Sequence, residues 1–449
     1  MDVSKTMFDQ YESAARGYCR RFDPIFASAS GSLMTDVAGK QYIDFLAGCG
    51  SLNYGHNDPN MSCALVRHIQ NNGLSAGLDL FSVAKGRFLE AFNRLILAPR
   101  GLDYRVQFTG PTGTNAVEAA MKLARKVTGR STIVSFTNGF HGVSLGALAA
   151  TGNKYNRMGM NLPGIARAPY DGYWGGSFDT AGYLEQLITD PSSGIEPPAA
   201  ILLETVQGEG GLNVASPLWV QRVAAIAKRH GALLIVDDVQ AGCGRTGSFF
   251  SFEPLGIVPD MVVMSKSISG YGLPMAIVLI KPEYDQWSPA EHNGTFRGNN
   301  HAFVTASVTL EKFWADRSFV KEIANKASLV TSRLRSIMEL APGSRLKGRG
   351  MMQGIAMANG ELADQICRHA FGNGLIVETS GPYDEVIKIL APLTTPEDIL
   401  QQGLDILESA TREVMAAQPG SNVIPMRRKE VEPSSELATS RFSGDSLAG

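Results

Sequence analysis

The feature that most constrains this chain is a series of short apolar runs in its middle, each followed at once by polar or glycine-rich residues. Between two of these runs, apolar positions from Leu218 to His230 recur at helical spacing, and Gly231 follows as a helix stop. A strand, a helix and a further strand in this order form a β-α-β unit, which predicts an α/β fold with a mainly parallel sheet. The predicted strands are Ile133 to Phe136, Ala200 to Leu203, Leu233 to Val236 and Met261 to Met264.

The length of 449 residues exceeds what one hydrophobic core usually serves, so we expect two domains that share a cleft. The larger domain is predicted at 61–309. Residues 1–60 and 310–417 carry turn, strand and helix signals, and these two ends are expected to build one smaller α+β domain. From 418 to 449 the chain is rich in Ser, Pro and charge, which predicts a disordered tail.

Composition argues against several classes of partner. A net charge of -2 provides no field for gripping a phosphate backbone, so nucleic acid is not an expected partner. The start of the chain lacks the apolar core of a signal peptide, and no apolar run is long enough to span a bilayer, so we expect no membrane association and a cytoplasmic location. The 5 cysteines are scattered, as expected for reduced thiols, and the 7 histidines never fall at metal-ligand spacing, so no metal site is predicted.

Charged residues follow three of the predicted strands. Glu204 and Asp237 each come directly after an apolar run, and Lys266 follows another with only Ser265 between. Ligands of open parallel sheets bind just beyond the carboxyl ends of the strands, so these side chains are candidates for a site. A structural ion pair between Asp237 and Lys266 is the alternative interpretation, because ion-pair networks produce the same pattern.

A glycine-broken loop supplies a candidate anion-binding part for such a site. The segment FTGPTGTNAVEAAMKLARKVTG leads into an amphipathic helix that is predicted to start near Thr114 or Asn115, and the free N–H groups of a helix start bind anions. A phosphate site, a sheet-end aspartate and a sheet-end lysine are together what pyridoxal phosphate (PLP) requires. The aspartate keeps the pyridine nitrogen protonated, and the lysine forms the imine.

The chain up to about residue 417 resembles the class III, or ω-amino, aminotransferases. Three segments carry the resemblance, in the family's order: LLIVDDVQAGCGRTG, PDMVVMSKSISGYGLP and HNGTFRGNNHAF. It implies the fold type I of PLP-dependent transferases, with a mainly parallel seven-stranded sheet in the large domain. Within the class, VSFTNGFHGVSLGALAATGN and ETVQGEGGLNVAS resemble the diaminobutyrate:2-oxoglutarate aminotransferases of ectoine and siderophore pathways.

The resemblance assigns roles residue by residue. It makes Lys266 the Schiff-base lysine and Asp237 the partner of the pyridinium nitrogen, and it places Glu204 in the cofactor site. Thr295 is expected to reach the phosphate from a neighbouring subunit, so the resemblance implies a homodimer or higher homo-oligomer with shared active sites. The remaining assignments are Val239 and Phe140 on the two ring faces, His141 with Gly142 in the adjoining turn, Gln240 at the ring hydroxyl, and Gly113 and Thr114 at the phosphate.

Residue types alone would assign several of these positions to structure. Phe140 would be a core aromatic, Thr295 a loop residue, and His141 a structural histidine. His56 of NYGH is interpreted as a structural histidine in any case.

The segment VIKILAPL is where this chain departs from the family pattern. Many class members carry an arginine here that pairs with a substrate carboxylate or with the glutamate of QGEGG, whereas this chain carries Lys388. A lysine is a point charge and not a bidentate fork, so carboxylate recognition must differ in geometry. The hypothesis is that Glu209 acts as a charge gate at the substrate site and that Lys388 is its partner.

The expected reaction transfers the terminal amino group of L-2,4-diaminobutyrate to 2-oxoglutarate and yields L-aspartate 4-semialdehyde and L-glutamate. An aminotransferase for another ω-amine, such as ornithine, 4-aminobutyrate or a specialised-metabolite precursor, is the alternative, because one methylene changes discrimination by only ~1–3 kcal/mol. A racemase, an aminomutase or a decarboxylating transaminase could use the same lysine and aspartate. A non-catalytic protein of this fold is a further alternative, which the intact Lys266, Asp237 and Gln240 disfavour.

Overall fold

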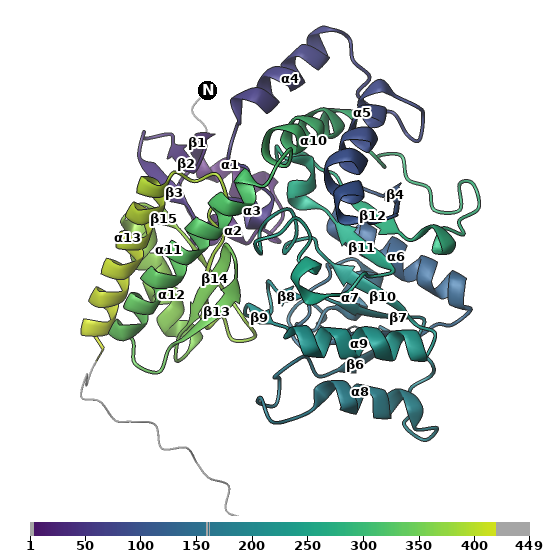
Figure 1. Cartoon of the computed structure of the whole chain (residues 1–449). Coiled ribbons are helices and arrows are strands. Elements are labelled where there is room, and N and C mark those ends of the chain that lie inside the picture. Colours follow the sequence, from purple (N-terminus) through teal and green to yellow (C-terminus); the bar gives the residue numbers. More distant parts are fainter. Residues whose placement is uncertain (1–3, 159, 161, 419–449) are drawn as a thin grey trace, which may run out of the picture.

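The computed structural model of the protein describes residues 4–158, 160 and 162–418. Figure 1 shows a larger unit built around a central sheet and a smaller unit in which the purple N-terminal strands lie beside the green and yellow C-terminal helices. Among the described residues, no helix is both long and apolar enough to cross a lipid bilayer. The predicted tail, apart from Gln418, lies outside the described residues.

The larger unit contains a seven-stranded sheet in the order β4-β12-β11-β10-β7-β5-β6. β12 runs antiparallel to both of its neighbours, and the other pairs are parallel. The mainly parallel seven-stranded sheet and the four predicted strands are therefore confirmed. The strands are β4 (Arg105–Phe108), β5 (Ile133–Phe136), β6 (Ile165–Ala168), β7 (Ala200–Leu203), β10 (Leu233–Asp237), β11 (Met261–Met264) and β12 (Ile277–Ile280).

Helices cover both faces of this sheet, which explains why its strands are apolar throughout. Successive strand residues point to opposite faces and enter two separate cores. Ile235 and Val263 pack into the core that contains α6 (Gly113–Thr128), whereas Val236 and Val262 pack into the core that contains α9 (Pro217–Arg229). Each fully buried aliphatic side chain of this kind contributes about 1.5–3 kcal/mol.

The helix predicted at 218–230 is α9. It begins where the Ser216 side chain accepts the amide of Trp219, and it ends before Gly231, whose φ of 63° is in the left-handed region. Further helices of the larger unit are α4 (Pro59–Gln70), α5 (Val83–Phe92), α7 (Leu145–Ala150), α8 (Thr180–Thr189) and α10 (Asn300–Phe313).

The smaller unit joins residues from both ends of the chain. β3 (Gln41–Asp44) pairs in parallel with β15 (Leu375–Ile376), so one sheet contains strands more than 300 residues apart. A second, antiparallel sheet has the order β13-β14-β17-β16. This pairing of the chain ends supports the predicted smaller domain, whose boundaries stay a prediction. The other elements are β1 (Phe26–Ser30), β2 (Leu33–Asp36), β13 (Arg345–Arg349), β14 (Met352–Ala356), β16 (Glu378–Ser380), β17 (Val386–Ile389), α11 (Ser318–Leu340), α12 (Gly360–Gly372) and α13 (Glu397–Ala416).

The chain also contains several short elements. They are α1 (Lys5–Tyr11), α2 (Tyr18–Arg21), α3 (Ala47–Gly50), β8 (Val206–Gln207), β9 (Asn213–Val214) and the 3-10 turn η4 (Lys266–Ser269).

Candidate active site

The carboxyl ends of β7, β10 and β11 meet at one edge of the large sheet, and the predicted site residues meet there. Glu204 follows β7, Asp237 is the last residue of β10, and Lys266 follows β11 after Ser265. A cavity opens at this edge. Its lining consists of Gly113, Thr114, Phe140, His141, Gly142, Glu204, Glu209, Asp237, Val239, Gln240 and Lys266.

Asp237 is held by two donors inside this cavity. Its Oδ2 lies 2.7 Å from His141 Nδ1, and its Oδ1 accepts the Val239 amide at 3.1 Å. Both Asp237 and His141 are buried. Sequence reasoning placed His141 in a turn and did not foresee that its ring would bind the aspartate, because the two residues are 96 positions apart.

Lys266 does not pair with Asp237, so the alternative interpretation of a structural ion pair is not what the structure contains. Lys266 Nζ donates to the Cys49 carbonyl at 2.8 Å. The backbone of Lys266 has a φ of 53°, in the left-handed region that a residue with a Cβ rarely adopts. Strained conformations of this kind are concentrated at functional sites, where the surrounding structure holds them in place.

Glu204 fixes the backbone that carries Phe140. Its Oε2 accepts the Phe140 amide at 2.9 Å, and its Oε1 accepts the Gly208 amide at 3.3 Å. Burial raises the pKa of Glu204, the His141 ring opposes the rise, and the charge of Asp237 adds to it. Glu204 therefore ties the Phe140 loop to the sheet edge within the cavity.

The glycine-broken loop forms the start of α6, which begins at Gly113, one to two residues before the predicted start. The first N–H groups of a helix have no partner within the helix, so those of Gly113 and Thr114 can serve an anion. Two glycines permit close packing here. A Cβ on Gly113 would come within 3.0 Å of Val239 Cγ1, and one on Gly142, whose φ is 123°, would come within 2.5 Å of Thr114.

Gln240 provides a test of whether a ligand fits this cavity. Its Nε2 donates to the Cys49 carbonyl at 3.0 Å and to Glu209 Oε1 at 2.9 Å. Its Oε1 is buried, and within the described part of the chain it has no hydrogen-bond partner. A buried acceptor without a partner costs free energy unless a ligand supplies the donor, and a ring hydroxyl is such a donor.

Lys388 lies behind Glu209, which lines the cavity, and contacts two carboxylates. Its Nζ is 2.9 Å from Glu209 Oε1, the predicted partner, and 2.9 Å from Glu378 Oε1. The Lys388 side chain is fully buried. Burial opposes its charge, but Glu209 and Glu378 outweigh that effect and raise the pKa of Lys388. Conversely, burial would raise the pKa of Glu209, but Lys388 and Lys266 lower it to about 2.

Glu378 is a residue that sequence reasoning missed. β16 and β17 pair antiparallel with Glu378 opposite Lys388, so both side chains point to the same face of the sheet. The signal was present in ETSGPYDEVIK, which can be read as two short strands around a turn, but only the pairing register makes the two residues neighbours.

Two further predicted residues lie elsewhere. Thr295 is exposed in the segment between β12 and α10, and it is not among the residues that line the cavity. His56 Nε2 lies 2.8 Å from Asp44 Oδ2, in agreement with a structural role. No group of three or more histidine, cysteine or acidic residues in the described ranges could hold a metal ion.

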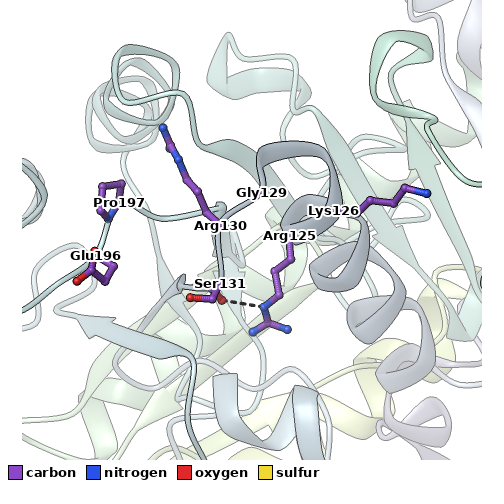
Figure 2. A pocket seen from close by; sticks show the side chains of 7 residues that line it. All are labelled: Arg125, Lys126, Gly129, Arg130, Ser131, Glu196 and Pro197. Atoms are coloured by element: carbon purple, nitrogen blue, oxygen red, sulfur yellow. Dashed lines mark hydrogen bonds between the residues drawn. The ribbon is translucent and has the colours of Figure 1, made fainter.

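A different hollow lies on the surface at the C-terminal end of α6 and is lined by Arg125, Lys126, Gly129, Arg130, Ser131, Glu196 and Pro197 (Figure 2). Its arginines bind main-chain carbonyls: Arg125 Nε donates to Ser131 at 2.8 Å, and Arg130 Nη1 donates to His230 at 2.7 Å. These contacts brace the connection after α6, and none of the predicted site residues is present.

Comparison with known proteins gives consistent matches along the chain. The family described as aminotransferase class III matches residues 18–411. A diaminobutyrate--2-oxoglutarate transaminase of Vibrio cholerae is 56% identical over 411 residues, which cover 91% of this chain and 100% of that protein. The protein of the same name from Bordetella parapertussis is 51% identical over 424 residues, covering 93% and 98%.

Solved structures support the fold. The ornithine aminotransferase of Toxoplasma gondii matches with a TM-score of 0.79 at 24% identity and covers 92% of this chain and 94% of its own. An aminotransferase of Bacillus anthracis matches with a TM-score of 0.81 at 23% identity, covering 91% and 97%. Together with the family match, these findings lead to one conclusion: the chain belongs to the class III aminotransferases.

Proposed function

We propose that this aminotransferase uses PLP to transfer the terminal amino group of L-2,4-diaminobutyrate to 2-oxoglutarate, yielding L-aspartate 4-semialdehyde and L-glutamate. The observation that carries the proposal is the cavity at the sheet edge, in which Lys266, Asp237 and the start of α6 surround one space. Relatives at 51–56% identity over nearly their full length bear the name of this reaction, which supports the choice of substrates.

The residues present fit PLP. Lys266 would hold it covalently, Asp237 would meet the ring nitrogen, and the N–H groups of Gly113 and Thr114 would bind the phosphate. Phe140 and Val239 would enclose the two ring faces, and the orphaned Oε1 of Gln240 would accept the ring hydroxyl. When bound, PLP supplies an electrophilic carbonyl carbon and a protonated ring that accepts an electron pair.

The chain's own residues then have defined tasks. In this proposal the Lys266 amine is the general base that takes a proton from the amine-bearing carbon of the donor. Asp237 would present its carboxylate to the ring nitrogen, and the His141 contact at 2.7 Å fixes the orientation of that carboxylate. Glu204, through the Phe140 amide, holds the stacking residue in place.

The proposed assembly is a homodimer, or a higher homo-oligomer, in which Thr295 enters the partner's cavity. Thr295 lies next to Phe296, which is 73% exposed, and an Arg297–Asp79 ion pair ties this segment to the one that carries Phe81. Phe81 is fully exposed, and Leu78 and Leu80 beside it are at least half exposed. An apolar surface of this kind marks an interface between chains.

The interface can be tested by sedimentation of a Phe81→Asp variant beside Leu218→Asp, which places the same charge at an exposed leucine of α9. Dissociation in the first variant alone is expected. A dimer that survives in both would place the interface elsewhere. The cytoplasm is the proposed location.

The substrates are tested with a panel of amines. L-2,4-diaminobutyrate, ornithine and 4-aminobutyrate are each assayed with 2-oxoglutarate, pyruvate and oxaloacetate, and kcat/KM is compared for every pair. Diaminobutyrate with 2-oxoglutarate is expected to give the highest value. A higher kcat/KM with ornithine or 4-aminobutyrate would replace the donor, and product formation without any acceptor would indicate a racemase or aminomutase instead.

A further inference from the structure

The charge count at the substrate end of the cavity is unusual, because one buried lysine faces two carboxylates. Lys388 lies between Glu209 and Glu378, at 2.9 Å from each, and the net charge of the three groups is -1. Two further cations lie nearby and are engaged elsewhere. Arg21 Nη1 donates to Thr379 and its Nη2 lies 3.9 Å from Asp384, whereas Lys266, whose charge also acts on Glu209, donates to the Cys49 carbonyl. A cluster with only one carboxylate would be neutral.

The two carboxylates differ in how they are held. Glu378 is on a strand opposite Lys388, and its side chain is only 6% exposed, so it stays beside the lysine. Glu209 follows β8, its side chain is 33% exposed, and it lines the cavity. Glu378 is therefore the permanent counter-ion of Lys388, which leaves the negative charge of Glu209 in excess and facing the substrate.

The contact between Glu378 and Lys388 is direct. Glu378 Oε1 lies 2.9 Å from the Lys388 ammonium, and this charged hydrogen bond is one of the contacts that raise the pKa of Lys388. This contact keeps one full negative charge beside Lys388 and balances the lysine's own charge.

We propose that Glu378 is a specificity-determining residue that makes the substrate end of the cavity net negative, and thereby favours a donor that carries a second ammonium group. This inference rests on the proposed function and names what separates the donor from its nearest analogue. L-2,4-diaminobutyrate and 4-aminobutyrate share the four-carbon chain, the carboxylate and the terminal amine. They differ only by the α-ammonium, which Glu209 is placed to receive.

The same charge acts in the opposite direction on the acceptor, because 2-oxoglutarate is a dianion and a net negative site repels it. Glu378→Gln removes one negative charge and keeps the shape of the side chain. The preference for diaminobutyrate over 4-aminobutyrate, as a ratio of kcat/KM, is expected to fall about tenfold, and the KM for 2-oxoglutarate is expected to fall about threefold. If Glu378 had only a structural role, the substitution would impair the use of the donor and of the acceptor together.

The experiment measures both quantities on the holoenzyme for the wild type, Glu378→Gln and Glu378→Asp. Glu339→Gln, which removes an exposed charge on α11, is the matched control and is expected to leave both quantities unchanged. Glu378→Asp keeps the charge and is expected to restore the ratio to within about twofold. An unchanged ratio in Glu378→Gln, or equal losses for donor and acceptor, would overturn the inference.

The outcomes for the two proposals can be told apart. A wild type that does not use diaminobutyrate refutes the proposed function, whereas a wild type that prefers it with an unshifted ratio in Glu378→Gln refutes only the role of Glu378. If Glu378→Gln does not fold, Lys388→Gln moves the net charge the other way. The ratio of kcat/KM for diaminobutyrate over 4-aminobutyrate must then rise. Both donors carry a carboxylate, so any lost contact between that carboxylate and residue 388 affects both donors equally and cancels in the ratio. A ratio that stays or falls overturns the inference.

Discussion

Two regions act on the same cavity and control charge by opposite means: one lines it, and the other reaches it through Glu209. The sheet edge, formed by the carboxyl ends of β7, β10 and β11, carries acids that burial dominates: burial raises the pKa of Glu204, and it raises that of Asp238 to about 7. The hairpin, formed by β16 and β17, carries Lys388, which outweighs burial and lowers the pKa of Glu209. The sheet edge is therefore suited to hold a cofactor in one place, and the hairpin is suited to bind the charged groups of successive substrates.

The two regions differ because their carboxylates have different hydrogen-bond partners. At the edge, carboxylates accept N–H groups of the backbone, as Glu204 does from Phe140 and Gly208. Such partners are fixed in space. At the hairpin, a carboxylate meets an ammonium group, and a substrate carboxylate can take the place of one member of that pair.

The largest effect is expected at the sheet edge. Lys266→Ala removes the proposed covalent anchor and the proposed base, so turnover should fall by more than about 1,000-fold. Glutamate formation measures the turnover, and the visible absorption of bound PLP should disappear as well. Retention of both signals would end the assignment of Lys266.

Asp237→Ala should cost less but still remove most of the rate, about 100-fold, because a neutral ring is a poor electron acceptor. PLP should remain partly bound, which its absorption after gel filtration can check. Near-normal turnover in this variant would contradict the role of Asp237.

At the hairpin, Lys388→Ala should act on binding and not on chemistry at the edge. Loss of a charged hydrogen bond to the acceptor carboxylate should raise the KM for 2-oxoglutarate about tenfold or more. Cofactor absorption should stay normal. If the KM does not change, Lys388 has no part in acceptor binding and the hairpin is only structural.

The smallest effect concerns stability and involves Asp238, the residue that follows Asp237 at the sheet edge. Because the pKa of Asp238 is raised to about 7 in the folded protein, its contribution to stability is full at acid pH and is lost as the pH rises through about 7. Asp238→Asn should therefore flatten the fall in Tm between about pH 4 and pH 7, by about 2–5 °C.

Melting curves across this pH range test the prediction, and an unchanged slope would contradict it.

The contribution of Glu209 to stability has the opposite pH dependence. Its pKa is lowered, so its contribution is present above the unfolded value near pH 4 and is lost as the pH falls toward about 2.

Much of the sheet edge could be predicted because it depends on local pattern. An apolar run that ends in a charged residue puts that residue at a strand end, and this placed Glu204, Asp237 and Lys266. The contacts between them could not be predicted. The Cys49 carbonyl that accepts Lys266 Nζ comes from 217 positions away, and the His141 ring that binds Asp237 comes from 96.

The sequence by itself determined the class of fold, the strands of the large sheet and the residue types available for chemistry, since each of these follows from neighbours along the chain. Only the tertiary structure decided which charges meet. The register of β16 against β17 sets Glu378 opposite Lys388, and the tertiary fold brings Glu209 to the same lysine. Charge interactions depend on distance in space, which the order of residues does not contain.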